Sequence, residues 1–148
     1  MAMTMNGEVT LPAGIDAVWA ALNDAEVLKA CIPGCEQLNK DDDTHFSAVV
    51  KVKLGPVKAS FKGKVELVDL DPPNGYKISG EGDGGVAGFA KGGASVTLTE
   101  KDGGTLLTYN VEAQIGGKLA QLGQRLINGS AKKIADEFFA NFAKAVQG

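Results

Sequence analysis

The chain opens with a strand pattern that gives way to a helical one. Residues 5–11 can form a short strand, and the Leu11–Gly14 stretch breaks it. The next apolar side chains recur at i, i+3, i+4 and i+7: Ile15, Val18, Trp19 and Leu22. This spacing places them on one face of a helix. Asn23–Asp24 ends that helix and offers an N-cap for a second short helix over residues 25–31, which the Pro33–Gly34 turn terminates.

From residue 46 the apolar period becomes two. One run of alternating small and apolar residues comprises Phe46, Ala48, Val50, Val52 and Leu54, and the next comprises Val57, Ala59, Phe61, Gly63, Val65 and Leu67. This alternation predicts a long β-hairpin with one buried face, joined at Gly55–Pro56 by a type II′ turn. Residues 76–82 and 89–99 predict two further strands. A turn at residues 101–104 leads into a last strand that alternates up to Ile115.

The helical period returns at about Lys118 and continues to about Val146. The order is therefore a strand, two short helices, a run of antiparallel strands and one long helix. A curved sheet must cover its apolar face, and only the long helix is large enough to do so. The pattern predicts an α+β fold in which the sheet wraps around the C-terminal helix. We expect residues 1–148 to form one domain.

Composition narrows the class of protein. The chain has 148 residues, a net charge of −3 and only two cysteines. The charge gives no global basic field for nucleic acid, so no nucleic-acid partner is expected. The N-terminus lacks the features of a signal peptide, and the apolar runs are too short for a membrane span. These features predict a cytoplasmic protein without a disulfide framework.

Glycine is enriched, with 20 residues, and residues 80–85 spell a G-x-G-x-x-G. A dinucleotide site needs a helix after this turn, so that the pyrophosphate meets the helix N-terminus. The sequence that follows, AGFAKGGASVTLTE, has a strand pattern instead. We therefore interpret these glycines as positions where a sheet bends or bulges. A further interpretation is that strands without side chains at these positions leave empty volume above the sheet.

The other candidate sites lack partners. Cys31 and Cys35 form a C-x₃-C turn, and with His45 they fall short of the four ligands of a zinc site. Triad chemistry needs a base beside a nucleophile, and the single histidine is expected at the surface. Glu81 and Asp83 lie on a glycine-rich segment where nothing would raise a carboxyl pKa. We expect no metal site, no cofactor and no catalytic residue.

One face of the hairpin is basic. It carries Lys51, Lys53, Lys58, Lys62 and Lys64. Lys53 should lie opposite Lys58, an unfavourable pairing of like charges. Lysine also keeps an outer sheet face soluble, and that interpretation is favoured. The functional alternative is a surface that docks anionic lipid headgroups or an acidic protein.

The C-terminal helix is depleted of bulk in its middle. Gly129, Ser130 and Ala131 replace large residues there, and Gly123 lies upstream. Small residues above glycine-rich strands would leave an apolar space between helix and sheet. Because protein interiors are close-packed, such a space predicts a ligand cavity.

Four stretches closely resemble the CoxG family of carbon monoxide dehydrogenase subunits: AVWAALNDAEVLKACIPGCE, GPVKASFKGKV, SGEGDGGVAGFAKGGASVTLTE and GGKLAQLGQRLINGSAKKIADEFFANF. The resemblance runs from about Glu8 to Phe142. That family lies in the START-like, or polyketide cyclase-like (SRPBCC), superfamily. The resemblance implies a helix-grip fold of the START-like and Bet v 1-like kind, in which the sheet often encloses an apolar ligand cavity.

The resemblance also implies a function. Family members are non-catalytic accessory proteins of molybdenum hydroxylases such as aerobic carbon monoxide dehydrogenase. They are associated with recruiting that enzyme to the inner face of the cytoplasmic membrane and with carrying a quinone or lipid. The cavity lining carried over to this chain comprises Ile32, Pro33, Phe61, Ile78, Phe89, Val96, Tyr109, Val111, Leu122, Leu126 and Ser130.

Two alternatives remain open at this point. In the first, the chain is an interaction or assembly factor that holds no ligand and docks its partner through the lysine face and the C-I-P-G-C turn. In the second, it is an enzyme of the cyclase or hydrolase type. Tyr109 is the only group that we would nominate for the enzyme.

Overall fold

A computed structural model describes residues 1–147 and contains one seven-stranded antiparallel sheet in the order β1-β7-β6-β5-β4-β3-β2. The strands are β1 (Ala2–Leu11), β2 (Cys35–Lys40), β3 (His45–Leu54), β4 (Val57–Asp71), β5 (Gly75–Asp83), β6 (Phe89–Lys101) and β7 (Gly104–Gly116). The helices are α1 (Ile15–Leu22), α2 (Ala25–Cys31) and α3 (Gln124–Val146), with 3₁₀ turns at η1 (Gly85–Ala87) and η2 (Gly117–Leu122).

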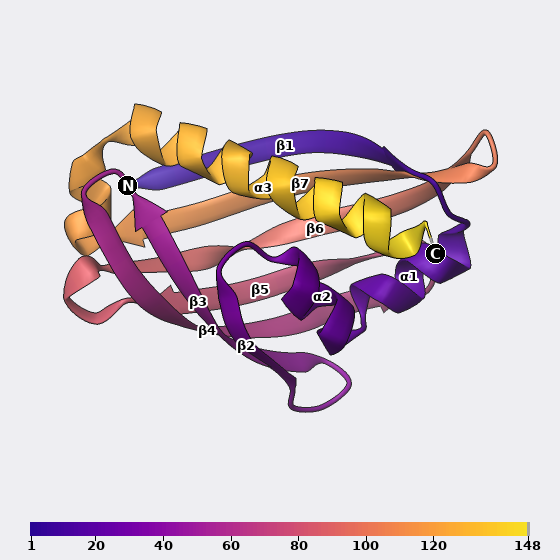
Figure 1. Ribbon diagram of the computed structural model, residues 1–148, viewed down its shortest axis with the longest axis horizontal. Coiled ribbons are helices and arrows are strands. Elements are labelled where there is room, and N and C mark those ends of the chain that lie inside the picture. The colour runs from indigo at the N-terminus through magenta and orange to yellow at the C-terminus, as the bar shows by residue number, and fades with distance from the viewer. Residues whose placement is uncertain (148) are drawn as a thin grey trace.

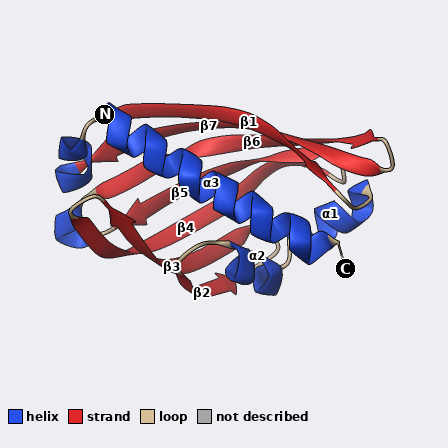
Figure 2. Cartoon of the chain, turned by 45° about the horizontal axis from the view of Figure 1, so that its top comes forward, coloured by secondary structure: helices blue, strands red, loops and turns tan. Residues whose placement is uncertain are grey.

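The sheet curves around α3, which crosses its inner face diagonally (Figure 1, Figure 2). α1 lies at the end of the sheet where α3 finishes, and α2 lies nearer the middle, beside the second half of α3. The start of α3 lies at the opposite end together with η2. The architecture predicted from the apolar periods, a sheet wrapped around the C-terminal helix, is confirmed.

The hairpin and the two short helices form as the local sequence predicts. β3 and β4 pair with Lys53 directly opposite Lys58, so the expected register is confirmed. The Asp24 carboxylate caps α2 by accepting hydrogen bonds from the backbone N–H groups of Glu26 and Val27, at 2.9 and 3.4 Å. Capping satisfies backbone donors that the first turn of a helix leaves unpaired.

The C-terminal segment differs from the prediction of one continuous helix from Lys118. A 3₁₀ turn occupies Gly117–Leu122, and α3 begins only at Gln124. Between them Gly123 adopts φ +89°, a left-handed value that side-chain-bearing residues rarely take. This break resets the rotational phase of the helix. As a result Ile127, Ala131 and Phe142 face inward, whereas Gly129 points outward.

β2 was not predicted, because its sequence, CEQLNK, is mostly polar and does not alternate clearly. It forms the sheet edge beside β3. In the glycine-rich stretch, the three-residue turn η1 joins β5 to β6, so no helix follows the G-x-G-x-x-G and the dinucleotide interpretation is excluded. Glycine there allows close approach of neighbouring strands: a Cβ at Gly92 would collide with the Glu112 carbonyl on β7.

Buried apolar side chains form two clusters. The larger one joins α1, α2 and the second half of α3 to the sheet and includes Leu11, Val18, Leu107 and Phe142. The smaller one fills the other end around Ile115, Leu119 and Ile127. The space between helix and sheet that remains unfilled is the candidate site.

Candidate functional site

A cavity of about 520 Å³ lies between the sheet and α3. Its floor comes from the inner faces of β4 to β7, and its roof comes from α3. Single residues of β1, β2, β3 and α1 complete the wall together with α2 and the segment that follows it. Ala94 on β6 and Ala131 and Ala135 on α3 leave room in the middle, because each has only a methyl group to fill the space. The volume falls within the range of small-molecule sites.

The cavity opens beside the middle of α3. Ile134 lines the wall and is 39% exposed, so an apolar side chain marks the mouth. Ile32 and Pro33, from the turn after α2, lie on the same wall. The Asn141 amide donates a hydrogen bond of 3.0 Å to the Cys31 carbonyl, which ties the end of α2 to α3. This contact holds the turn that carries Ile32 and Pro33 beside α3.

Aromatic rings form a continuous part of the wall. Tyr109 and Phe139 are stacked at 5.1 Å, and Phe138 meets Phe139 edge-on at the same centroid distance. Tyr76 also lines the cavity, and Trp19 of α1 packs edge-on against it at 5.4 Å. Burial raises the pKa of Tyr76 to about 12, so its hydroxyl stays protonated at neutral pH.

The structure brings together only part of the predicted lining. Six of the residues named from the sequence border the cavity: Ile32, Pro33, Ile78, Val96, Tyr109 and Val111. Five do not, and their placement corrects the expectation: Phe61, Phe89, Leu122, Leu126 and Ser130. Leu122, Leu126 and Ser130 border a shallow groove on the outer side of α3 instead, because the break at Gly123 turns them away from the sheet.

The two phenylalanines of that group have other neighbours. Phe61 belongs to the smaller core cluster, and its ring lies against Gly84. Phe89 is 49% exposed and packs against Gly116. Both lie toward the end of the molecule where α3 begins, whereas the cavity lies under the middle and second half of the helix.

Sequence reasoning missed much of the actual lining. On the strands the additional wall residues include Phe46, Val65, Leu67, Tyr76 and Ala94, and on α3 they include Ala131, Ile134, Ala135, Phe138 and Phe139. The alternation of the hairpin already indicated that Phe46, Val65 and Leu67 face inward. The position of the cavity along α3 could be found only by knowing which residues of α3 face the sheet, and the break at Gly123 determines this.

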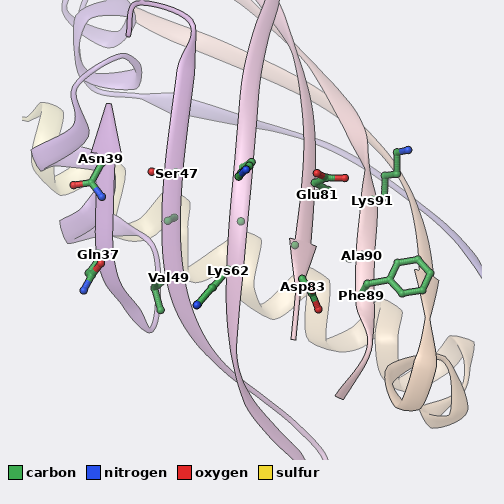
Figure 3. Close-up of a pocket in the computed structure, with 14 residues that line it drawn as sticks. Gln37, Asn39, Ser47, Val49, Lys62, Glu81, Asp83, Phe89, Ala90 and Lys91 are labelled. Atoms are coloured by element: carbon green, nitrogen blue, oxygen red, sulfur yellow. The ribbon is translucent and has the colours of Figure 1, made fainter. Parts of the chain in front are cut away.

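A second hollow, of about 700 Å³, lies on the outer face of the sheet. Figure 3 shows Lys62, Glu81, Asp83 and Lys91 on neighbouring strands of this face, with Gln37 and Asn39 on β2. The predicted lysine face lies on this side: Lys51, Lys53, Lys58, Lys62 and Lys64 are all exposed. Of these, Lys62 and Lys64 line the hollow, and Lys51 lies 3.9 Å from Glu36.

The remaining candidates lie apart from the cavity. Burial raises the pKa of the thiols of Cys31 and Cys35, which disfavours the reactive thiolate. His45 is exposed, and its hydrogen bond with Asp42, 2.8 Å long, raises its pKa. Within residues 1–147 no three metal-ligating side chains gather, and none of the helices is long and apolar enough to cross a membrane.

Comparison with known proteins identifies the fold and a family. Residues 7–147 match the CoxG family, which is described as a subunit of carbon monoxide dehydrogenase. The chain is similar to a conserved protein from Geobacillus kaustophilus, with 33% identity over 97% of this chain and 95% of that one, and a TM-score of 0.91. No curated protein sequence matches the chain.

More distant structures share the fold. The ZhuI aromatase/cyclase from Streptomyces sp. R1128 is 11% identical over 99% of this chain and 94% of that one, with a TM-score of 0.72. Ara h 8.0201 is 16% identical over 99% and 98% of the two chains, with a TM-score of 0.69. These similarities confirm the predicted α+β helix-grip fold of the Bet v 1-like and polyketide cyclase-like kind.

Proposed function

The chain belongs to the CoxG family of carbon monoxide dehydrogenase subunits, and on that premise we propose that it is a non-catalytic accessory protein of a molybdenum hydroxylase of the carbon monoxide dehydrogenase type. It holds a quinone or lipid in the cavity between sheet and α3. It also helps to recruit the enzyme to the cytoplasmic membrane.

The apolar wall of the cavity is the observation that supports ligand binding. Its wall is made of apolar and aromatic side chains, and of the described lining residues only Tyr76 and Tyr109 contribute a side-chain oxygen. Close-packed proteins contain few voids larger than a water molecule, so an apolar space of about 520 Å³ favours a lipophilic occupant. An elongated ligand would place its ring inside and let its tail leave beside Ile134.

The same wall argues against catalysis of the cyclase or hydrolase type. Such chemistry needs a general acid or base with a pKa near the working pH. Among the described residues 1–147, those that line the cavity include no carboxylate, histidine, lysine or cysteine. The raised pKa of Tyr76 makes its hydroxyl a poor acid and leaves almost no phenolate to act as a base. The Tyr109 hydroxyl is then the one group left for the enzyme alternative among the described lining residues.

A fluorescence titration tests the ligand part of the proposal. Trp19 is the single tryptophan, and it contacts the cavity residue Tyr76. The probe is 2,3-dimethyl-1,4-naphthoquinone, whose substituted ring does not add to thiols. We expect saturable quenching with one site per chain. Quenching that rises linearly, as it does for free N-acetyltryptophanamide, would contradict ligand binding.

Membrane recruitment is supported by the end of the molecule where α3 begins (Figure 1). Val86 on η1 is 86% exposed, and Phe89 and Leu126 are 49% and 38% exposed. A Cβ at Gly55 would lie 2.9 Å from Leu126, so the β3–β4 turn with Lys53 and Lys58 is at the same end. Apolar side chains beside basic ones suit the surface of an anionic bilayer.

Reversing the charge of Lys53 and Lys58 together, as K53E/K58E, should weaken binding to vesicles that contain phosphatidylglycerol. Each basic residue near an anionic surface contributes about 1 kcal/mol, so the double variant should lose at least about 30-fold in affinity. Co-sedimentation with vesicles measures the loss, which should shrink in high salt.

The matched control is K101E/K144E, which has the same net charge. Lys101 and Lys144 are exposed at the opposite end of the molecule, near the β6–β7 turn and the C-terminus (Figure 1). Its vesicle binding should be several-fold stronger than that of K53E/K58E. Equal losses in the two variants would mean that only net charge matters and would refute a docking end.

The outer hollow favours a second candidate function, an interaction factor that docks the partner and holds no ligand. Lys62, Lys64, Glu81 and Lys91 line this hollow and form no ion pair within residues 1–147, so their charges are available to a protein partner. This candidate gains support if the quinone titration fails and K62E/K64E abolishes binding to the hydroxylase. It fails if that variant binds normally.

A further inference from the structure

In the part of the chain that the structure describes, two hydroxyl groups are the only side-chain oxygens in an otherwise apolar cavity wall. They belong to Tyr76 on β5 and Tyr109 on β7, and both residues lie on the inner face of the sheet. In the strand register Tyr76 is opposite Val96 of β6, and Val96 is opposite Tyr109. The two tyrosines therefore flank Val96 on the cavity floor.

The Tyr109 hydroxyl lies at the edge of the sheet. A Cβ on Gly7 of β1 would come within 2.6 Å of the Tyr109 oxygen, which places this oxygen above the edge strand. A polar crevice between β1 and α3 reaches Tyr109 from outside and is also lined by Asn128, Lys132 and Asp136. Water in that crevice can bind the Tyr109 hydroxyl, so this group is not reserved for a molecule inside the cavity.

Tyr76 does not line that polar crevice, and its hydroxyl makes no hydrogen bond within residues 1–147. The residue is only 7% exposed, and its ring is held by the edge-on contact with Trp19. Burial alone raises its pKa, with no hydrogen bond to another group of residues 1–147 contributing. Tyr76 is therefore a neutral donor in the cavity wall whose hydrogen bond is not made within the protein. No fully buried side-chain oxygen within residues 1–147 lacks a partner, so the unpaired Tyr76 oxygen is open to the cavity, where a carbonyl oxygen of a ligand can accept its hydrogen bond.

The opposite side of the cavity is suited to a flat ring. Phe139 of α3 stacks on Tyr109 with an angle of 25° between the ring planes, and Phe138 packs against Phe139. Ala94 and Val96 of β6 form a low floor between Tyr76 and Tyr109. A planar ring above that floor has aromatic side chains on one side and a single free donor on the other. Aromatic pairs add to the stabilisation that burial provides.

We propose that Tyr76 determines which ligands the cavity accepts, by donating a hydrogen bond from its hydroxyl to a carbonyl oxygen on the ring of an apolar ligand. This inference rests on the proposed function and deepens it, because it selects a ring ketone or quinone over an acyl chain. Specificity follows since an acyl chain or a pure hydrocarbon leaves the donor unpaired, whereas a ring carbonyl pairs it.

Two probes of similar shape test the proposal in the full chain. 2,3-Dimethyl-1,4-naphthoquinone carries two carbonyl acceptors, and 2,3-dimethylnaphthalene carries none. Equilibrium dialysis gives the affinity of each probe for the wild-type protein and for Tyr76→Phe, which keeps the ring and removes only the hydroxyl. We expect Tyr76→Phe to weaken quinone binding about tenfold and to change hydrocarbon binding less than about twofold.

Further measurements separate this role from a structural one. The melting temperature of ligand-free Tyr76→Phe should equal or exceed that of the wild type, because the hydroxyl makes no bond within the protein. Tyr109→Phe provides the comparison with the other hydroxyl. A selective loss of quinone binding in Tyr109→Phe, with none in Tyr76→Phe, would overturn the assignment.

The same experiment distinguishes this inference from the proposed function. If both probes bind the wild type and Tyr76→Phe changes both equally or neither, the cavity binds ligands but Tyr76 does not select them. If neither probe binds the wild type, ligand binding itself is refuted, and the inference falls with it.

Discussion

Replacing Phe142 by alanine is expected to lower the free energy of unfolding by about 3–5 kcal/mol, as is typical when a buried phenylalanine is truncated. The Phe142 side chain is 0% exposed and stacks on Phe138 at 5.7 Å. It anchors the second half of α3 in the larger core, where Leu11 and Val18 are also fully buried. Because small domains are stable by only about 5–15 kcal/mol, this loss is large enough to populate the unfolded state.

Urea unfolding measures the effect, and Phe89→Ala is the matched control. Phe89 is 49% exposed on the opposite end of the molecule, so the same truncation should cost only about 1 kcal/mol. A loss for Phe142→Ala no greater than that for Phe89→Ala would contradict the assignment of the core to the α3–sheet interface.

Filling the cavity should abolish ligand binding without unfolding the protein. The double variant Ala94→Phe/Ala135→Leu adds bulk to the floor and the roof at once, where only methyl groups stand now. If about 120 Å² of ligand surface loses its burial, the loss is about 3 kcal/mol, or about 100-fold in affinity. The melting temperature should stay constant or rise, because filling a void is commonly stabilising. Quenching of Trp19 by the dimethylnaphthoquinone measures the binding.

The control for this variant makes the same alanine-to-leucine change on α3 outside the cavity. Ala140 lies on the exposed side of α3, so Ala140→Leu enlarges the helix surface without entering the space above the sheet. Its quinone affinity should match that of the wild type. If the filled variant still binds the quinone with wild-type affinity, the ligand site lies elsewhere, and the outer hollow becomes the first alternative.

The sequence predicts most of the fold because the apolar periods of α1 and of the long strands are clear. Alternation specifies the β3–β4 hairpin down to the pairing of Lys53 with Lys58. The 3.6-residue spacing specifies α1, and Asp24 marks the start of α2. The sequence does not predict β2, because an edge strand needs few apolar residues when its pairing with β3 supplies the hydrogen bonds.

The sequence predicts an apolar cavity between helix and sheet, but it places that cavity at the wrong position along the helix. Periodicity cannot register the break at Gly123, since the apolar residues on both sides keep a helical spacing. The reset phase turns Leu126 and Ser130 away from the sheet and brings Ala135 and Phe139 over it. The small residues that open the space are therefore Ala94, Ala131 and Ala135 and not Gly129.

The proposed function depends on an apolar cavity that takes up a lipophilic molecule. Native mass spectrometry of the intact chain, sprayed together with the dimethylnaphthoquinone, tests this most directly. We predict a species heavier than the free chain by the mass of one quinone, which disappears in Ala94→Phe/Ala135→Leu. Detection of the ligand-free mass alone, at probe concentrations that saturate any micromolar site, would contradict uptake by the cavity.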